Sequence, residues 1–171
     1  MAGRIVQVAT STITTTTAFV DLIGTTTDDV YLLTGNNLVV DTDAKQWNLR
    51  VLKSSSPDVS ANYDYGYKQI RTDSAYFNGA VPNATFYGAT FLGTAGGEDG
   101  NFIAYLYNFN DSSEYSYIST EESSIASNNA NTGTFAGIVH TVASASNGIR
   151  ISCNNGSNNF TSGKLTLYKI L

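Results

Sequence analysis

Apolar and polar residues alternate with period two in several short segments of the chain. Near the C-terminal end, Ile149, Ile151 and Cys153 alternate with polar residues, and Leu165 and Leu167 do so again after a loop of Asn, Gly, Ser and Thr. This alternation, bounded by Gly and Asn clusters, is typical of β-strands that bury one face. Because a terminal strand is usually held by pairing, we expect the last strand, residues 164–170, to pair near the N-terminal strands.

The same pattern recurs along the whole chain, and no segment shows sustained helical spacing of its apolar residues. Further strands are expected at residues 5–8, 18–23, 30–33, 38–40, 47–52, 62–71, 85–92, 101–109, 115–119, 134–142 and 149–153. A polar loop is expected at residues 53–61 and a mobile glycine-rich loop at residues 93–100. We find no internal repeat and no linker. Many short strands at near-regular spacing predict one all-β domain, residues 1–171, built as a sandwich or a barrel.

The composition supports this fold class. The chain holds 21 Thr, 18 Ser and 17 Asn, a polarity that would suit disorder, but disordered chains lack aromatic and β-branched residues. Here 11 Tyr and 8 Phe accompany many Val, Ile and Thr, which favour half-buried pleated surfaces. The single cysteine, Cys153, excludes an intramolecular disulfide, so packing and hydrogen bonds are expected to stabilise the fold.

The charge pattern argues against two classes of partner. The net charge is −5, and the nine Lys and Arg residues are scattered singly along the sequence. Nucleic acids and anionic membranes are bound by clustered cations, so neither is expected as a partner. The sequence also lacks a segment of transmembrane length, and its first residues lack the features of a signal peptide. We therefore expect synthesis in a cytoplasm.

The candidate catalytic and metal-binding residues are few. His140 and Cys153 lie on the apolar faces of predicted strands, which favours structural roles, although a spatial Ser–His–Asp arrangement stays open. One His and one Cys cannot form the usual zinc site. The carboxylates fall mostly in predicted turns, which favours solubilising roles over a glycosidase pair, and residues 97–101 offer only a weak calcium candidate. We expect no catalytic centre, no cofactor and no metal.

Tyrosine is the more informative excess. Tyr63, Tyr65 and Tyr67 share one face of a predicted strand, and Tyr115 and Tyr117 share another. These five residues are candidate contacts for a neighbouring subunit or for sugar rings, because Tyr is enriched at interfaces. The alternative, which we favour for them, is a cross-strand aromatic cluster at the edge of the core.

The order of these segments resembles that of small structural virion proteins of tailed bacteriophages, notably phages of aquatic bacteria. The resemblance rests on residues 28–31 (DDVY), 36–38 (NNL) and 47–51 (WNLRV), and on residues 148–151 (GIRI), 159–163 (NFTSG) and 164–170 (KLTLYKI). Lys169 departs from the family, which often has Gly after the last Tyr. The resemblance implies a jelly-roll sandwich of two antiparallel sheets that serves as a capsid decoration, head-fibre or tail-fibre protein.

Three classes of function remain open at this stage: a structural virion protein, a carbohydrate-binding module such as the receptor-binding tip of a tail fibre, and an enzyme. We expect the first, with the second as the alternative. The resemblance implies a homotrimer attached to a major capsid protein or a tail protein, with a host surface glycan as a further candidate partner. Residues 1–17 are the candidate anchor segment, because they precede the predicted core.

Overall fold

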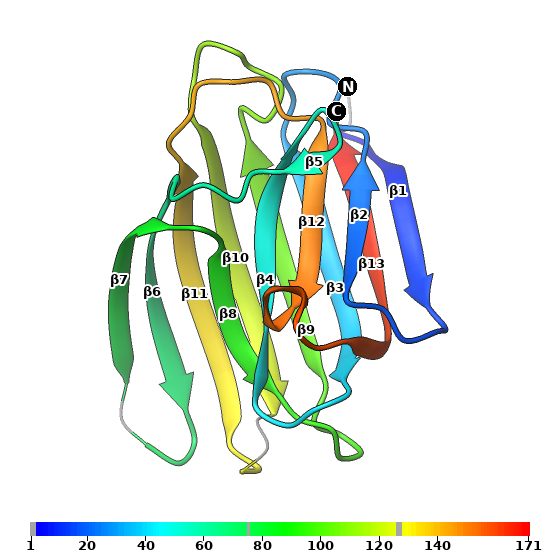
Figure 1. Ribbon diagram of the computed structural model, residues 1–171, viewed down its shortest axis with the longest axis vertical. Helices are drawn as coiled ribbons and strands as arrows, with labels where there is room; N and C mark the ends of the chain where they lie inside the picture. The colour runs from blue at the N-terminus through cyan, green and yellow to red at the C-terminus, as the bar shows by residue number, and fades with distance from the viewer. Residues whose placement is uncertain (1–2, 75, 126–127) are drawn as a thin grey trace.

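The computed structural model describes residues 3–74, 76–125 and 128–171, and these residues form a sandwich of two antiparallel β-sheets (Figure 1). The larger sheet has eight strands, in the order β1 (Ile5–Ile13), β13 (Phe160–Ile170), β3 (Tyr31–Val40), β9 (Gly100–Tyr107), β10 (Ser116–Ile125), β11 (Asn131–His140), β6 (Tyr63–Arg71) and β7 (Phe77–Ala84). The smaller sheet has the order β2 (Phe19–Ile23), β12 (Gly148–Cys153), β4 (Lys45–Lys53) and β5 (Ser56–Pro57), and β8 (Tyr87–Leu92) also pairs with β4. A 3-10 turn, η1 (Asn154–Gly156), follows β12.

The strand pairing has the connectivity of a jelly roll. β1 pairs with β13, β2 with β12, β3 with β9 and β4 with β8, so that strands from the two ends of the chain pair in sequence toward its middle. A long hairpin rolled into two sheets has this nested pairing. The all-β sandwich predicted from the sequence is therefore confirmed, and so is the pairing of the last strand with the first.

Two hairpins are added to this framework, and they determine which surfaces are left open. The β6–β7 hairpin lies between β4 and β8 in the sequence, and the β10–β11 hairpin lies between β9 and β12. Both join the same edge of the larger sheet, beyond β9. The larger sheet therefore extends past the smaller one, as Figure 1 shows for β6 and β7.

The alternating apolar residues meet between the sheets. Trp47 of β4 stacks on Phe102 of β9, with ring centroids 4.1 Å apart, and contacts Tyr87 edge-on at 5.8 Å. Phe102 in turn covers Gly35 of β3, where a Cβ atom would lie 2.1 Å from the Phe102 ring. Trp47, Ile151 and Leu167, from three strands predicted by alternation, are each at most 1% exposed, which confirms the faces assigned to these strands.

Several boundaries differ from the sequence-based expectation. Residues 31–33 and 38–40 belong to one strand, β3. Of the two alternatives that the sequence offers for residues 35–37, a bulge or a tight turn, the structure has the bulge, near Asn37. β10 continues to Ile125, six residues past the predicted end, and the loop expected at 53–61 contains β5. β7 was not predicted at all, because Gly79, Pro82 and Asn83 are typical of turns, and an edge strand tolerates them since one side of its backbone needs no partner.

Candidate functional site

The outer face of the larger sheet, which is turned away from the smaller sheet, carries most of the exposed aromatic residues of the sheet's centre. Strand alternation directs four aromatic side chains and one isoleucine outward from β9, β10 and β11, and each is more than a third exposed: Tyr105, Tyr107, Tyr117, Phe135 and Ile103. Single exposed apolar residues are ordinary, but a contiguous group of them marks an interaction surface. We call the surface formed by the outward residues of β7, β6, β11, β10 and β9 the outer face.

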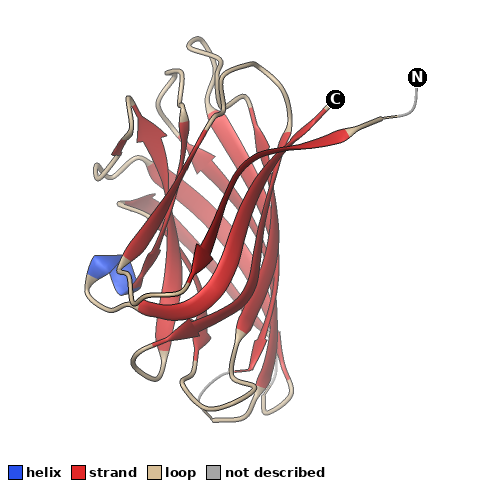
Figure 2. Cartoon of the chain, turned by 90° about the vertical axis from the view of Figure 1, so that its right-hand side faces the viewer, coloured by secondary structure: helices blue, strands red, loops and turns tan. Residues whose placement is uncertain are grey.

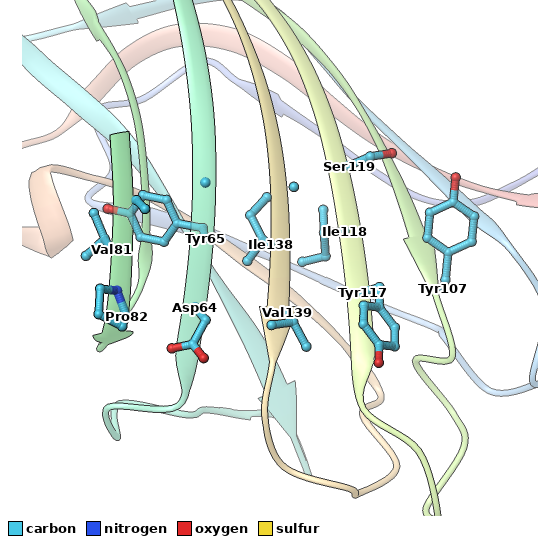
Figure 3. Close-up of a pocket in the computed structure, with 13 residues that line it drawn as sticks. Asp64, Tyr65, Val81, Pro82, Tyr107, Tyr117, Ile118, Ser119, Ile138 and Val139 are labelled. Atoms are coloured by element: carbon cyan, nitrogen blue, oxygen red, sulfur yellow. The ribbon is translucent and has the colours of Figure 1, made fainter. Parts of the chain in front are cut away.

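The strand register arranges the outer face in rows that run across the strands. The Gly137 row contains Ala80, Gly66, Gly137, Ser119 and Tyr105. The Val139 row contains Asp64, Val139, Tyr117 and Tyr107, and Figure 3 shows it crossing four strands. The Phe135 row contains Asn78, Lys68, Phe135, Glu121 and Ile103.

The small residues of the Gly137 row form the floor of a groove. A depression of about 660 Å³ lies between this row and the Val139 row, and a second of about 380 Å³ lies between it and the Phe135 row. Gly66, Gly137 and Ser119 line both, so the two depressions form one continuous groove. Its walls combine aromatic side chains, such as Tyr107, Tyr117 and Phe135, with aliphatic ones, and its charged groups are Asp64, Lys68 and Glu121.

A second opening lies on the opposite side of the β6–β7 hairpin, where that hairpin extends past β8. We call this opening of about 360 Å³ the edge cleft. Aromatic and polar side chains alternate around it, namely Gln46, Tyr65, Tyr67, Gln69, Arg71, Phe77, Phe91 and Thr134. Gln69 donates to the Thr134 hydroxyl at 3.3 Å, and Arg71 is paired with Asp73 at 2.7 Å. Apolar rings beside amide and guanidinium donors suit a polyhydroxylated ligand.

The structure separates the five candidate tyrosines. Tyr63 is fully buried, and its hydroxyl accepts from the Val51 N–H and donates to the Asp58 carbonyl, so Tyr63 is a core residue. Tyr65 and Tyr67 face the same side, are half-buried, and line the edge cleft. Tyr117 lies on the outer face, whereas Tyr115 is exposed in the loop before β10. Only Tyr63 is thereby removed as a surface contact.

His140 belongs to a buried polar network rather than to an open cleft. Its Nε2 lies 2.9 Å from Asp58 Oδ2, which also accepts from Lys53 at 3.0 Å and from Asn62 at 3.1 Å. Burial lowers the pKa of His140 and so favours the neutral ring. The hydrogen bond to Asp58 has the opposite effect but is the smaller of the two. Burial alone would raise the pKa of Asp58, but its hydrogen bonds from His140 and its other partners hold it well below the ordinary value.

This network lacks a nucleophile among the described residues. The second ring nitrogen of His140, Nδ1, is buried without a hydrogen-bond partner, and the ring is fully buried. The Ser116 side chain, from the residue paired with His140 across β10 and β11, is directed instead to the Asn108 carbonyl. A Ser–His–Asp arrangement requires a serine hydroxyl on the imidazole, so the described residues do not form one around His140.

Glu122 is a buried carboxyl that sequence reasoning did not single out. It lies on the inward side of β10 and accepts hydrogen bonds from Tyr87 and Thr120 at one oxygen and from the N–H and hydroxyl of Thr90 at the other. Burial raises the pKa of Glu122 despite these four donors. Because Tyr87 and Thr90 belong to β8, this carboxyl joins the larger sheet to the smaller one.

The other sequence candidates have structural surroundings. Cys153 is buried, and burial raises the pKa of its thiol to about 12, which makes the thiol unreactive. In the glycine-rich loop, the Glu98 side chain turns inward and accepts from the Ala95 N–H at 2.9 Å, so its carboxylate holds the loop itself. Within the described ranges, no three His, Cys, Asp or Glu side chains converge as they would at a metal site.

The candidate anchor segment is largely part of the sandwich. Residues 5–13 form β1, an edge strand paired with β13 along its length. Figure 2 shows the start of β1 and the end of β13 extending beyond the rest of the sandwich. Ile5 is 57% exposed there, so this end of the strand pair remains available for contacts. Residues 1–2 of the proposed anchor lie outside the described residues.

Comparison with known proteins adds no assignment to this geometry. The chain has no significant similarity to any protein-family model, curated protein or solved structure against which it was compared. No helix within the described residues is long and apolar enough to cross a membrane. The functional argument therefore depends on the outer face and the edge cleft.

Proposed function

We propose that this protein is a structural component of a bacteriophage virion, a capsid decoration or fibre protein that acts through protein–protein contacts and not as an enzyme. The observation that carries the proposal is the outer face, an exposed aromatic surface on the larger sheet. The resemblance of the chain's segment order to that of small virion proteins also supports the proposal. Sandwich folds host unrelated functions, so the fold by itself does not distinguish among them.

In this proposal, two regions of the larger sheet make different contacts. The outer face binds copies of the chain, because its groove and aromatic walls require a complementary surface of matching shape. The projecting end of β1 and β13, with Ile5 exposed, attaches the protein to a major capsid or tail protein. The resemblance implies a homotrimer, a prediction that competes with the two-fold dimer inferred below. Location in the virion after synthesis in the host cytoplasm also stays a prediction.

The test is to find the protein on particles. Purified virions from the source are labelled with a gold-conjugated antibody against the protein and viewed by electron microscopy. Regular labelling of the head or of the tail is the expected result, with quantitative mass spectrometry giving a copy number related to the symmetry of that structure. Absence of the protein from purified particles would contradict the proposal.

The edge cleft supports a second candidate function, the binding of a host surface glycan. Tyr67 lines the cleft beside Gln69 and Arg71, so an aromatic ring for stacking and donors for sugar hydroxyls lie together. Such binding would make the protein a receptor-binding module.

We expect Tyr67→Ala to weaken polysaccharide binding at least about tenfold, because a stacked ring contributes roughly 1–1.5 kcal/mol or more. Binding is measured on arrays of bacterial surface polysaccharides and then by calorimetry. The matched control is Tyr117→Ala, which removes the same side chain from the opposite face of the sheet and leaves glycan affinity unchanged. Equal effects of the two substitutions, or no binding by the unaltered protein, would remove this candidate.

A further inference from the structure

The outer face is unequal on the two sides of its central strand, β11. In the Gly137 row, β9 on one side of β11 carries the large Tyr105, and β7, equally far away on the other side, carries the small Ala80. The two strands next to β11 carry Ser119 and Gly66 in this row. Tyr105 thus protrudes at one end of the Gly137 row, and the face is hollow over Ala80 at the other end, at the same distance from β11.

The polar groups follow the same division. In the Phe135 row, Lys68 and Glu121 lie directly on either side of Phe135, so a cation and an anion are equidistant from β11. In the Val139 row, Asp64 and Tyr117 flank Val139 in the same way, which sets a carboxylate opposite a phenol. In each row, one side of β11 therefore carries a group complementary to the group on the other side. Within one copy these two groups are too far apart to interact, because they lie two strands, or about 9–10 Å, from each other.

We infer that a second copy of this chain packs face to face on the outer face, related by a two-fold axis that runs along β11 in the plane of the interface. Such an axis exchanges the two sides of the face. It places Lys68 of one copy against Glu121 of the other, and Asp64 against the Tyr117 hydroxyl. It also places Tyr105 over the hollow at Ala80, so that the protruding side fills the groove.

Sheet geometry is compatible with this arrangement. An axis along β11 leaves the strands of the two copies nearly aligned, as packed sheets prefer, with about 10 Å between them. A two-fold contact is also closed, since the same patch serves both copies and leaves none free for further growth. Five strands and three rows cover on the order of 500 Å² per copy, or about 1,000 Å² for the two copies together, which is at the lower limit for a specific interface.

The charges distinguish a second copy from other occupants. A glycan or a foreign protein would gain nothing from having Lys68 and Glu121 equidistant from one strand. In the two-fold dimer this spacing produces two equivalent ion pairs, each between Lys68 of one copy and Glu121 of the other. Both residues are exposed, and Lys68 also lies 4.9 Å from the Tyr76 ring centroid, which restricts its position beside β6.

A charge exchange tests the inference. The dissociation constant of the dimer is measured by sedimentation velocity for the unaltered protein, for Lys68→Glu, for Glu121→Lys and for the double variant. Each single change brings like charges together at both pairs and is expected to weaken the dimer at least about tenfold. The double variant restores opposite charges and is expected to return to within about threefold of the unaltered protein.

The control is Lys164→Glu on β13, four strands from β11 in the sheet, which is expected to leave the dimer unchanged. Circular dichroism checks that every variant is folded, which is expected because the altered side chains are exposed. The inference is overturned if the unaltered protein stays monomeric up to about 100 μM, forms a discrete trimer, or if the double variant is as weak as the single ones.

The inference rests on the proposed use of the outer face for assembly, but the two fail in different ways. A protein that is dimeric in solution and absent from virions would retain the dimer and lose the virion function. A protein that is present on virions and monomeric in solution would retain the function and lose the two-fold contact.

Discussion

Glu122→Ala is expected to lower the free energy of unfolding by about 3 kcal/mol or more, the largest effect among the substitutions considered for this protein. The substitution removes the acceptor of four hydrogen bonds from Tyr87, Thr90 and Thr120. The Thr90 N–H is then left buried without a partner, and the link between β10 and β8 is lost. Urea denaturation followed by tryptophan fluorescence measures the change, since Trp47 reports on the same core.

Glu122→Gln is the matched control, and we expect it to cost less than about 1.5 kcal/mol. The glutamine oxygen can accept from the Thr90 N–H, while its amide donates to the hydroxyls of Tyr87 and Thr120, which rotate to accept. The two substitutions thus differ mainly in whether the hydrogen bonds survive. Equal losses for Ala and Gln would show that the negative charge, and not the hydrogen-bond network, is what the core requires.

The second large effect is a loss of stability on acidification, caused by His140. Its folded-state pKa is lowered, so the unfolded chain binds the proton first as the pH falls below about 6.5. The stabilisation is complete above that pH and is lost toward lower pH, by at most about 1.4 kcal/mol per pH unit for one group. Asp58, whose pKa is also lowered, adds to the loss only below about pH 4.

Glu122 acts in the opposite direction. Its raised folded-state pKa means that the folded protein binds this proton more readily, so stability increases as the pH falls toward the ordinary Glu value near 4.5. The contribution of His140 is therefore measured most clearly in the Glu122→Gln background, where this compensation is absent.

In that background we expect the free energy of unfolding to decrease steadily from pH 7 to pH 5, and His140→Gln to remove most of the slope. The glutamine can still donate to Asp58 but does not titrate. Urea denaturation at half-unit pH intervals gives the free energy of unfolding of each variant. The slopes of this free energy against pH are then compared. An unchanged slope after His140→Gln would assign the pH dependence to another group.

The sequence predicts the fold well where the inward positions are apolar. Trp47 on β4, Ile151 on β12 and Leu167 on β13 follow strict alternation, and all three strands were found close to their actual positions. Hydrophobic periodicity reports directly on burial, so the sandwich and its terminal pairing could be derived from it.

The signal fails in the added hairpins, where polar residues face inward. In β10 the inward positions after Ile118 are Thr120, Glu122 and Ser124, all nearly buried, while Tyr117 faces outward. The hydrophobic pattern is weak here because the Glu122 network replaces apolar packing. The hydrophobic pattern consequently predicts the end of this strand at residue 119, whereas β10 continues to Ile125.

The sequence predicts the candidate site only in part, because the site depends on tertiary structure. The alternation of Tyr63, Tyr65 and Tyr67 was correct, but it could not show that Tyr63 is in the core while Tyr67 lines a cleft. That difference depends on how far the larger sheet extends past β8, which is a property of the tertiary structure. The Gly137 row was missed because Gly66, Gly137 and Ser119 are adjacent only through the strand register.

A cysteine at Gly137 tests most directly the claim that the outer face is the working surface. Gly137 lies on the inferred two-fold axis, and a Cβ added there meets no atom within 4 Å, so Gly137→Cys should fold normally. Cys153 is buried and does not compete. The two Cα atoms are expected to lie about 10 Å apart across the interface, too far for a direct disulfide, so a short thiol-specific cross-linker is used. Cross-linking of Gly137→Cys is expected to give a covalent dimer in high yield at micromolar concentration, whereas Ser55→Cys, exposed in the loop after β4, gives little. Equal and low yields for both variants, from protein that sediments as a monomer, would contradict the account.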